Sequence, residues 1–229
     1  MWAYCNGKIN DHSNILFEYQ PTRNGDHAVN FLGDFNGYLV CDGYGGYNKL
    51  YKVKRCGCMA HVRRKFVEAL PLEAELQISS QAARGVEWCN KLFHLESDFE
   101  KLLPEERYIQ RQERSKDTLD GFFGWLDTVS PNGGSKLFKA VSYAKNEKNN
   151  LYRFLKSPDV PISNNRIKNC IRPFCVGRSN WKFCDSVKGA KASAMFYSLA
   201  ATACANGLNI ENYFAELLRQ KPGTMYLPW

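Results

Sequence analysis

The side chains best suited to chemistry gather in the stretch VCDGYGGYNKLYKVKRCGCMAHVRRKF, residues 40–66. It offers an acid, a group of zinc-type ligands and a run of cations: Asp42; Cys56, Cys58 and His61; Arg63, Arg64 and Lys65. Carboxylates bind hard cations such as Mg²⁺, thiolate and imidazole bind zinc, and arginine and lysine contact phosphates. Three kinds of site are therefore compatible with this one stretch.

Asp42 follows the apolar run GYLVC and precedes Gly43. Such a run predicts a buried strand, and the carboxyl ends of strands are where open α/β sheets expose functional groups. An aspartate before glycine is also typical of a turn, in which the carboxylate accepts a hydrogen bond from nearby backbone. The spacing alone favours the turn, and both interpretations of Asp42 stay open at this point.

Cys56, Cys58 and His61 are a weak zinc candidate. Structural zinc needs four ligands, and no second Cys-x-x-Cys or His-x-x-x-His pair lies nearby, so we expect small buried thiols and no zinc. The chain has nine cysteines, and its start, MWAYCNGKIND, lacks the basic and then apolar profile of a signal peptide. We therefore expect reduced thiols and a cytoplasmic protein.

Positive charge is concentrated towards the end of the chain. The net charge is +8, and residues 161–229 carry nine lysines and arginines against three acids. Phosphate contact is one interpretation, with Trp181 and Phe183 able to stack on bases, and a solvated basic face is the other. The DNA contacts that we predict are Arg63, Arg64, Lys65, Arg166, Arg172, Arg178 and Lys182.

The elements that must position these residues follow an α/β pattern that changes to helices. WAYC and NILFEYQ predict a hairpin, GDHAVNFL a short helix, GYLVCD a strand, YGGYNKLY a short helix and KVKRCGC a strand. Helices are then predicted over residues 59–70, about 73–103, 105–129 and 135–156. After an N-cap at Ser163 we predict a helix through Ile171, an irregular stretch or hairpin over 177–186, and an Ala- and Ser-rich helix over 187–206 that suits close approach to a sheet. No apolar run approaches the roughly 18 residues that cross a bilayer, so we expect a soluble chain with no membrane partner.

Three blocks of this sequence resemble the catalytic domain of bacterial transposases of the insertion-sequence-66 family. They are FLGDFNGYLVCDGYGGYNKLY with CMAHVRRKF, PISNNRIKNCIRPFCVGRSNWKF, and GAKASAMFYSLAATACANGLNIENY, and the resemblance covers residues 2–219 in the family's order. It implies an RNase H-like mixed sheet with a large all-helical insertion. The implied domains are 1–57, the first part of the core; 58–158, the insertion; and 159–229, the second part with basic helices.

The resemblance also implies metal-dependent DNA strand cleavage and transfer by three carboxylates that hold two Mg²⁺ ions. Asp42 matches the second aspartate, and Cys58 with His61 matches a Cys-x-x-His signature just beyond it. The third carboxylate position holds Lys168, and the family's first aspartate lies on a strand upstream of WAYC. A lysine there brings positive charge to the place of two cations, so we expect poor Mg²⁺ binding. The absent first strand is expected to leave two sheet edges unpaired.

These departures shape the functional prediction. We predict a transposase catalytic domain that acts on transposon DNA but is inactive in this chain, with Asp42 as its sole catalytic and Mg²⁺-binding carboxylate. The alternative is a non-catalytic DNA-binding or regulatory module that associates with an intact transposase. The predicted partners are double-stranded DNA at transposon ends and a second copy or an intact transposase, in the bacterial cytoplasm.

Overall fold

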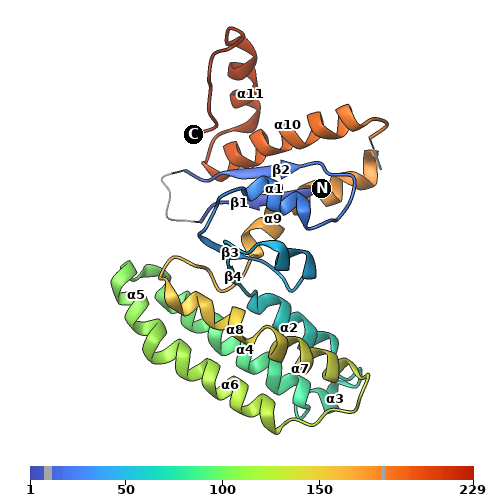
Figure 1. The fold of residues 1–229 in the computed structure, drawn as a ribbon, viewed down its shortest axis with the longest axis vertical. Coiled ribbons are helices and arrows are strands. Elements are labelled where there is room, and N and C mark those ends of the chain that lie inside the picture. Colours follow the sequence, from blue (N-terminus) through green and yellow to red (C-terminus); the bar gives the residue numbers. More distant parts are fainter. Residues whose placement is uncertain (8–11, 182–183) are drawn as a thin grey trace. The chain divides into compact units, whose positions relative to one another are not determined.

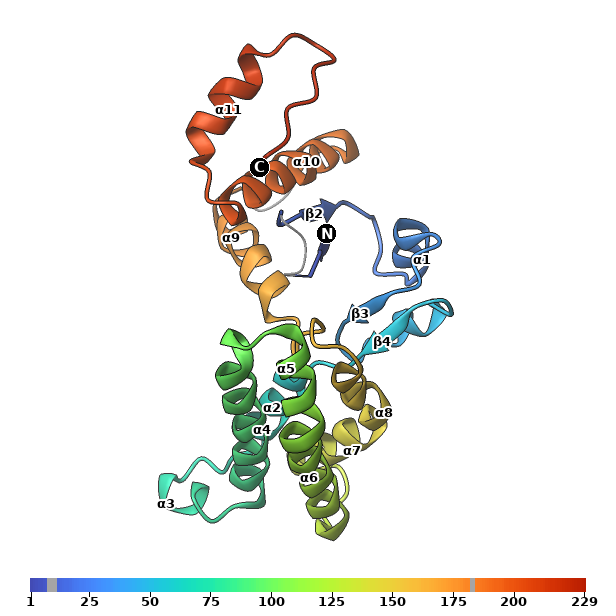
Figure 2. The same ribbon diagram turned by 90° about the vertical axis from the view of Figure 1, so that its left-hand side faces the viewer.

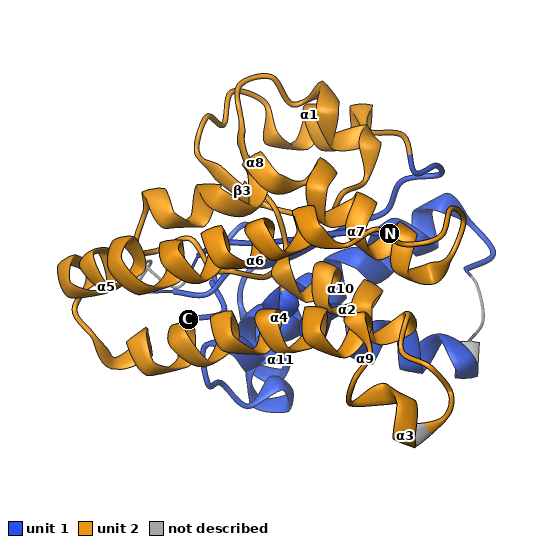
Figure 3. Ribbon diagram, turned by 90° about the horizontal axis from the view of Figure 1, so that it is seen from below, with its two compact units in different colours: residues 1–23, 165–229 blue, residues 24–164 orange. Residues whose placement is uncertain are grey.

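A β-hairpin with three helices forms one part of the chain, and a parallel pair of strands followed by a helical block forms the other. These are seen in a computed structural model, which describes residues 1–7, 12–181 and 184–229. Unit 1 consists of Met1–Arg23 and Asn165–Trp229, and unit 2 of Asn24–Asn164 (Figure 3). The domain boundaries predicted from the sequence lie after residues 57 and 158 and differ from the limits of these two units. That domain division stays a prediction.

The hairpin of unit 1 has the two predicted strands. β1 (Trp2–Cys5) pairs antiparallel with β2 (Ile15–Glu18), from Trp2 opposite Glu18 to Cys5 opposite Ile15. The helices of this unit are α9 (Asn165–Trp181), α10 (Val187–Ala205) and α11 (Ile210–Arg219) (Figure 1). Ile15 and Phe17 lie on the same face of β2, because successive side chains of a strand point to opposite faces. Both are buried.

Helix α10 lies along β2 (Figure 1). Two of its side chains, and that of its C-cap residue Asn206, bind the backbone of residues 13–17. They are spaced four residues apart, so one face of the helix presents all three. The pairs are Ser198 with Phe17, Thr202 with Ile15, and Asn206 with Ser13. Each side chain accepts the backbone N–H, at 2.8, 3.0 and 2.8 Å respectively, and Thr202 and Asn206 also donate to the carbonyl of the same residue. The outer edge of β2 is thus satisfied by a helix where another strand would otherwise pair.

Helix α9 corrects the sequence prediction. It begins at Asn165 and continues through Pro173 to Trp181, whereas we predicted an end at Ile171 and an irregular stretch from residue 177. Proline removes one backbone donor and disfavours a helical residue before it, which is why the prediction stopped there. The helix continues because its apolar side chains pack on the hairpin, with Phe174 at 6.4 Å from Phe17 between ring centroids. Tertiary packing outweighs the local penalty.

Unit 2 begins with the elements that carry the Asp42 stretch. They are α1 (Asp26–Leu32), β3 (Tyr38–Val40), the 3₁₀ helix η1 (Gly45–Lys49) and β4 (Lys54–Cys56), all near their predicted places. β3 and β4 pair in parallel, from Tyr38 opposite Lys54 to Val40 opposite Cys56. Because the strands are parallel, both carboxyl ends lie at the same edge of this small sheet.

The rest of unit 2 is helical, as predicted (Figures 1 and 2). The helices are α2 (Met59–Glu68), α3 (Ala74–Gln77), α4 (Gln81–Asp98), η2 (Phe99–Lys101), α5 (Pro104–Gln110), the π turn η3 (Arg111–Ser115), α6 (Lys116–Thr128), α7 (Lys136–Asn146), α8 (Lys148–Leu151) and η4 (Tyr152–Lys156). The single helix predicted over about 73–103 is divided, because the Ser80 hydroxyl accepts the Ala83 N–H at 3.1 Å and starts α4 anew.

An apolar core joins these helices. Phe66 of α2 is fully buried, with its ring centroid 6.2 Å from that of Phe122 and 6.0 Å from that of Trp125, both on α6. Gly85 of α4 faces the same ring, and a Cβ at that position would overlap it. The missing side chain therefore allows α4 to approach α2. Burial of one such aromatic side chain stabilises the fold by about 1.5–3 kcal/mol.

The mixed α/β class predicted from the sequence is confirmed, but its sheet is not continuous. Among the described residues, β1 pairs with β2 alone and β3 with β4 alone, so two separate two-stranded sheets are present. An edge of β1 and an edge of β3 therefore lack a strand partner in this part of the chain. In the same residues no helix has the length and apolar character to cross a membrane.

Candidate functional site around Asp42

Asp42 lies just beyond β3, at the carboxyl edge that β3 shares with β4. The ladder extends one residue past the strand, where Cys41 N–H donates to Cys56 O at 3.0 Å. The Asp42 Oδ1 accepts the Tyr44 N–H at 3.1 Å, which is the turn interaction, and its side chain is 33% exposed. The two interpretations of Asp42 are therefore compatible, because one oxygen holds the turn and the carboxylate still reaches solvent.

Two side chains from the helical block face this turn. His61 of α2 places Nε2 3.9 Å from Asp42 Oδ2, and the Tyr143 hydroxyl of α7 accepts the Gly43 N–H at 3.2 Å. Burial raises the pKa of Tyr143 to about 12, although its hydrogen bond from Gly43 opposes the rise. Tyr143 is therefore a neutral phenol at ordinary pH. A side chain on Gly43 would meet the Tyr143 ring, so glycine permits this contact.

A buried ion pair lies behind the strand end. Arg55 of β4 is 3.4 Å from Glu147, and Arg153 donates to the Arg55 carbonyl at 2.7 Å. Both side chains of the Arg55–Glu147 pair are only 13% exposed. Burial raises the pKa of the neighbouring Cys41 thiol to about 12, so this thiol stays protonated. These contacts of Arg55 hold β4 to the helical block behind the Asp42 turn. Glu147 is buried in this ion pair, whereas the Asp42 side chain reaches solvent.

The cysteines of the stretch have separate partners. Cys58 donates to Asn164 Oδ1 at 3.1 Å and accepts the Asn164 N–H at 3.4 Å, while the Cys56 thiol lies 3.7 Å from the Lys54 carbonyl. Within the part of the chain that the structure describes, no three His, Cys, Asp or Glu side chains are grouped as a metal site. Cys56, Cys58 and His61 are thus not gathered as zinc ligands.

The donor set around Asp42 does not fit the magnesium ions that the resemblance implies. Mg²⁺ prefers several oxygen ligands in octahedral geometry, whereas Asp42 has the imidazole of His61 near it and, among the described residues, belongs to no group of three possible metal ligands. The Asp42 Oδ1 already accepts a backbone hydrogen bond. We therefore assign no step of a reaction to a metal bound by this chain alone.

The predicted DNA contacts divide into two groups. Arg63 donates to Asn90 Oδ1 of α4 at 2.7 Å, and Arg166 donates to Asn6 O at 3.0 Å and Ser13 Oγ at 2.7 Å. These two guanidinium groups are used inside their own units. The other described cations reach solvent: Arg64, Arg172 and Arg178 are exposed, and Lys65 is half-buried. Lys182 and the possible stacking residue Phe183 lie outside the described residues, and Trp181 is the last residue of α9.

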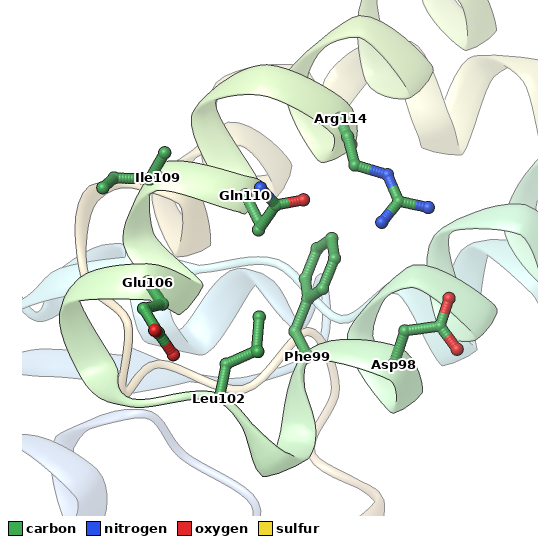
Figure 4. Close-up of a pocket in the computed structure, with 7 residues that line it drawn as sticks. All are labelled: Asp98, Phe99, Leu102, Glu106, Ile109, Gln110 and Arg114. Atoms are coloured by element: carbon green, nitrogen blue, oxygen red, sulfur yellow. The ribbon is translucent and has the colours of Figure 1, made fainter.

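A surface cavity of unit 2 lies elsewhere (Figure 4). Its volume is about 430 Å³, and its lining is Asp98, Phe99, Leu102, Glu106, Ile109, Gln110 and Arg114. The Arg114 guanidinium lies 5.3 Å from the centroid of the Phe99 ring. None of the residues predicted to act on DNA lines this cavity.

Two residues of the site were missed from the sequence, Tyr143 and Asn164. Tyr143 is one of two aromatic residues on the amphipathic helix α7, and nothing local distinguishes it from a core residue. Asn164 is 106 positions from Cys58, its partner, so no spacing rule connects them.

Comparison with known proteins gives one family. A family described as Transposase IS66 family matches residues 1–192. The uncharacterized proteins y4hP and y4qI of Sinorhizobium fredii are each 28% identical to this chain over 89% of its length, and y4jD of the same organism is 26% identical over 90%. The chain spans only 39–42% of the length of these curated relatives. No solved structure matches it.

Proposed function

The chain belongs to the IS66 family of transposases. We propose that it acts in DNA transposition as an inactive form of the catalytic domain, which binds transposon DNA without cutting it. The RNase H-like fold is part of this proposal. It is supported by a hairpin followed by a parallel strand pair with an acid at its carboxyl edge. Transposition is the role that family membership suggests.

One observation carries the inactive part of the proposal. Among the described residues Asp42 belongs to no group of three His, Cys, Asp or Glu side chains that could hold a metal ion, and the position that matches the family's third acid is Lys168. Transfer of a phosphoryl group by two metal ions needs several carboxylates to hold the cations against a polyanionic substrate. A lysine offers no lone pair when protonated, so it cannot replace the missing ligand.

The DNA-binding part rests on the charge of unit 1. Its C-terminal segment, 165–229, carries nine lysines and arginines against three acids, and Arg172 and Arg178 are exposed on α9. Arg64 and Lys65 of unit 2 and Lys182 complete the proposed set of phosphate contacts. Such contacts release counterions, so affinity should fall steeply with salt.

A cleavage assay tests the inactive part. The chain is incubated with a duplex that carries the inverted repeats of its own element, in Mg²⁺ and separately in Mn²⁺, and the products are separated on a denaturing gel. We expect an intact duplex in both metals. Cleavage that Asp42→Ala abolishes would refute the proposal that the chain is inactive.

A salt titration tests the binding part. For a 30-base-pair duplex we expect the logarithm of the binding constant to fall linearly with the logarithm of salt. Arg172→Ala and Arg178→Ala should each make this slope shallower, reducing its magnitude by about 0.9. Arg219→Ala is the matched control, because Arg219 is an exposed arginine of unit 1, 75% accessible, outside this set and paired with Glu216. Binding without salt dependence would contradict phosphate contact.

The alternative, a regulatory module that joins an intact transposase, is favoured by the sheet edges. In the described residues β1 and β3 each pair on one side only, and an edge of this kind accepts a strand from another chain. Size-exclusion chromatography of the chain mixed with a full-length relative tests it. A shared peak supports association. Separate peaks would contradict it and would leave DNA binding without cleavage as the remaining proposal.

A further inference from the structure

The first turn of α2 has contacts that neither the metal chemistry nor the phosphate contacts explain. The chain leaves β4 at Gly57, whose N–H donates to Asn150 O at 2.9 Å. A Cβ on Gly57 would lie 3.0 Å from the Leu151 side chain, so glycine allows this close passage. Cys58 is the N-cap residue of α2 and is 1% exposed. The start of α2 is therefore anchored against α8.

Three hydrogen bonds tie this turn to residues 162–164. Met59 N–H donates to Ile162 O at 3.0 Å, the Cys58 thiol donates to Asn164 Oδ1 at 3.1 Å, and Asn164 N–H returns to Cys58 Sγ at 3.4 Å. The thiol thus acts as donor and acceptor towards one residue. Each bond to sulfur is weak, but the reciprocal pair fixes both the side chain and the backbone of Asn164.

The same turn also meets Asp42. His61 is three residues after Cys58, and its Nε2 lies 3.9 Å from Asp42 Oδ2. One helical turn therefore connects the strand end at Asp42 with the segment 162–164, all within unit 2. Asn164 is also the last residue before α9, the helix that carries Arg172 and Arg178.

Other roles for Cys58 are inconsistent with its surroundings. A nucleophile must reach substrate, and this thiol is 1% exposed. Cys56 and Cys58 are free thiols with separate partners, and no three-ligand metal group exists among the described residues. What remains is the pair of hydrogen bonds that spans 106 positions of the chain.

We propose that Cys58 and Asn164 are a positioning pair, which holds residues 162–164, the last ones before α9, against the first turn of α2. The inference rests on the proposed function, since its consequence is tighter DNA binding. If residues 162–164 are already ordered in the free protein, DNA binding by the α9 cations loses less conformational entropy in this segment.

Four variants test the pair: Cys58→Ala, Asn164→Ala, the double variant, and Cys58→Ser, which keeps a donor and an acceptor. Cys56→Ala is the matched control, because it removes an equally buried thiol, also 1% exposed, that does not contact Asn164. Two measurements are made on the full chain: amide hydrogen exchange at residues 162–166, and the Kd for the 30-base-pair duplex at fixed salt.

We expect Cys58→Ala, which removes both bonds to sulfur, to speed exchange at 162–164 by about fivefold and to weaken DNA binding by about threefold. Asn164→Ala removes only the bond from the thiol to Oδ1 and keeps the backbone N–H to Sγ bond, so it should have a smaller effect in the same direction. The double variant should be no worse than Cys58→Ala, since that variant already removes both bonds. Cys58→Ser should recover part of both losses. Cys56→Ala should leave exchange at 162–164 and the Kd unchanged, even if its melting temperature falls.

The two readouts separate the pair from the proposed function. Equal effects of Cys58→Ala and Cys56→Ala on exchange at 162–164, or fully additive losses in the double variant, would overturn the pair. Faster exchange with an unchanged Kd would keep the pair but refute its contribution to binding. A wild-type chain that fails to bind DNA would refute the proposed function, while exchange would still decide whether the pair holds the segment. If Cys58→Ala does not fold, Asn164→Ala still tests the bond from the thiol to Oδ1.

Discussion

Unit 1 and unit 2 are stabilised in different ways. Unit 2 buries a continuous set of large apolar side chains, with Phe66 and Phe122 fully buried at its centre. Unit 1 buries Ile15, Phe17 and Ala194, and relies on the polar contacts between α10 and β2. Apolar packing tolerates little change of volume, whereas a set of hydrogen bonds depends on each partner. The two units should therefore fail under different substitutions.

The units also differ in charge. By sequence, unit 1 has a net charge of +6 and unit 2 has +2, although unit 2 is the longer of the two. A small, highly charged unit repels itself when compact, so its stability should rise with salt. The same salt should weaken the proposed binding to DNA. In that proposal unit 1 carries most of the net positive charge that would face the polyanion.

The largest expected effect sharpens the contrast in packing. Phe66→Ala should destabilise unit 2 by about 3–5 kcal/mol, because it removes an aromatic ring and leaves a cavity. Urea unfolding followed by tryptophan fluorescence measures the loss, and hydrogen exchange in β1 and β2 should stay unchanged. Leu72→Ala is the control, since that side chain is 94% exposed. Equal loss of protection in the hairpin would show that the two units unfold together.

Adding one methyl group tests the same core from the other direction. Gly85→Ala should cost about 1–3 kcal/mol, because its Cβ overlaps the Phe66 ring and α4 must move. Gly124→Ala on α6 is the matched control: it has open space around the Cβ, and alanine should stabilise that helix by about 0.5–1 kcal/mol. Thermal melts of the two variants should therefore shift in opposite directions. A stable Gly85→Ala would mean that α2 and α4 are less tightly packed than the structure shows.

A polar substitution should act on unit 1 instead. Thr202→Val keeps the shape of a 4%-exposed side chain but leaves the N–H and the carbonyl of Ile15 without their partner. We expect a loss of about 1–2 kcal/mol, seen as faster exchange of β2 amides while the helices of unit 2 keep their protection. Thr118→Val, where the exposed hydroxyl donates to a helix carbonyl, should change stability by less than about 0.5 kcal/mol.

Thiol labelling should reveal the smallest difference between the units. Cys175, Cys184 and Cys204 of unit 1 are exposed and should react first, as located by mass spectrometry of peptides. Burial raises the pKa of Cys89 in unit 2 from 9.0 to about 12, so in the folded state it stays a protonated, unreactive thiol. The unfolded chain ionises near pH 9, so this thiol's contribution to stability is full below pH 9 and declines as pH rises towards 12. Rapid labelling of Cys89 at pH 8 would contradict its burial.

Local signals in the sequence predict much of this fold. The hairpin, α1, β3, β4 and the helical block were predicted near their observed places, because alternation, turn residues and helical spacing act within a few neighbours. Ser80 was missed as a cap, since apolar spacing continues across it. Pro173 was given too much weight, because the packing that keeps α9 intact comes from the hairpin, far away in the sequence.

The candidate site was less accessible to prediction. Asp42 was found from the strand before it, and His61 from its spacing to Cys58. That His61 and Tyr143 face Asp42 depends on helix packing that no local pattern specifies. Arg63 and Arg166 have the charge of phosphate contacts, and only the structure shows that both are hydrogen-bonded within their own units. Bonds such as the one between Thr202 and Ile15, 187 positions apart, depend on tertiary folding.

The contact between α10 and β2 has a consequence for how copies of this chain could assemble. With the β2 side closed by side chains, a further strand can join the hairpin only beside β1. Two hairpins that met through their β1 strands would form a four-stranded sheet with a helix along each outer side. Growth would stop at that pair, so unit 1 is protected against the endless strand stacking that produces fibrils.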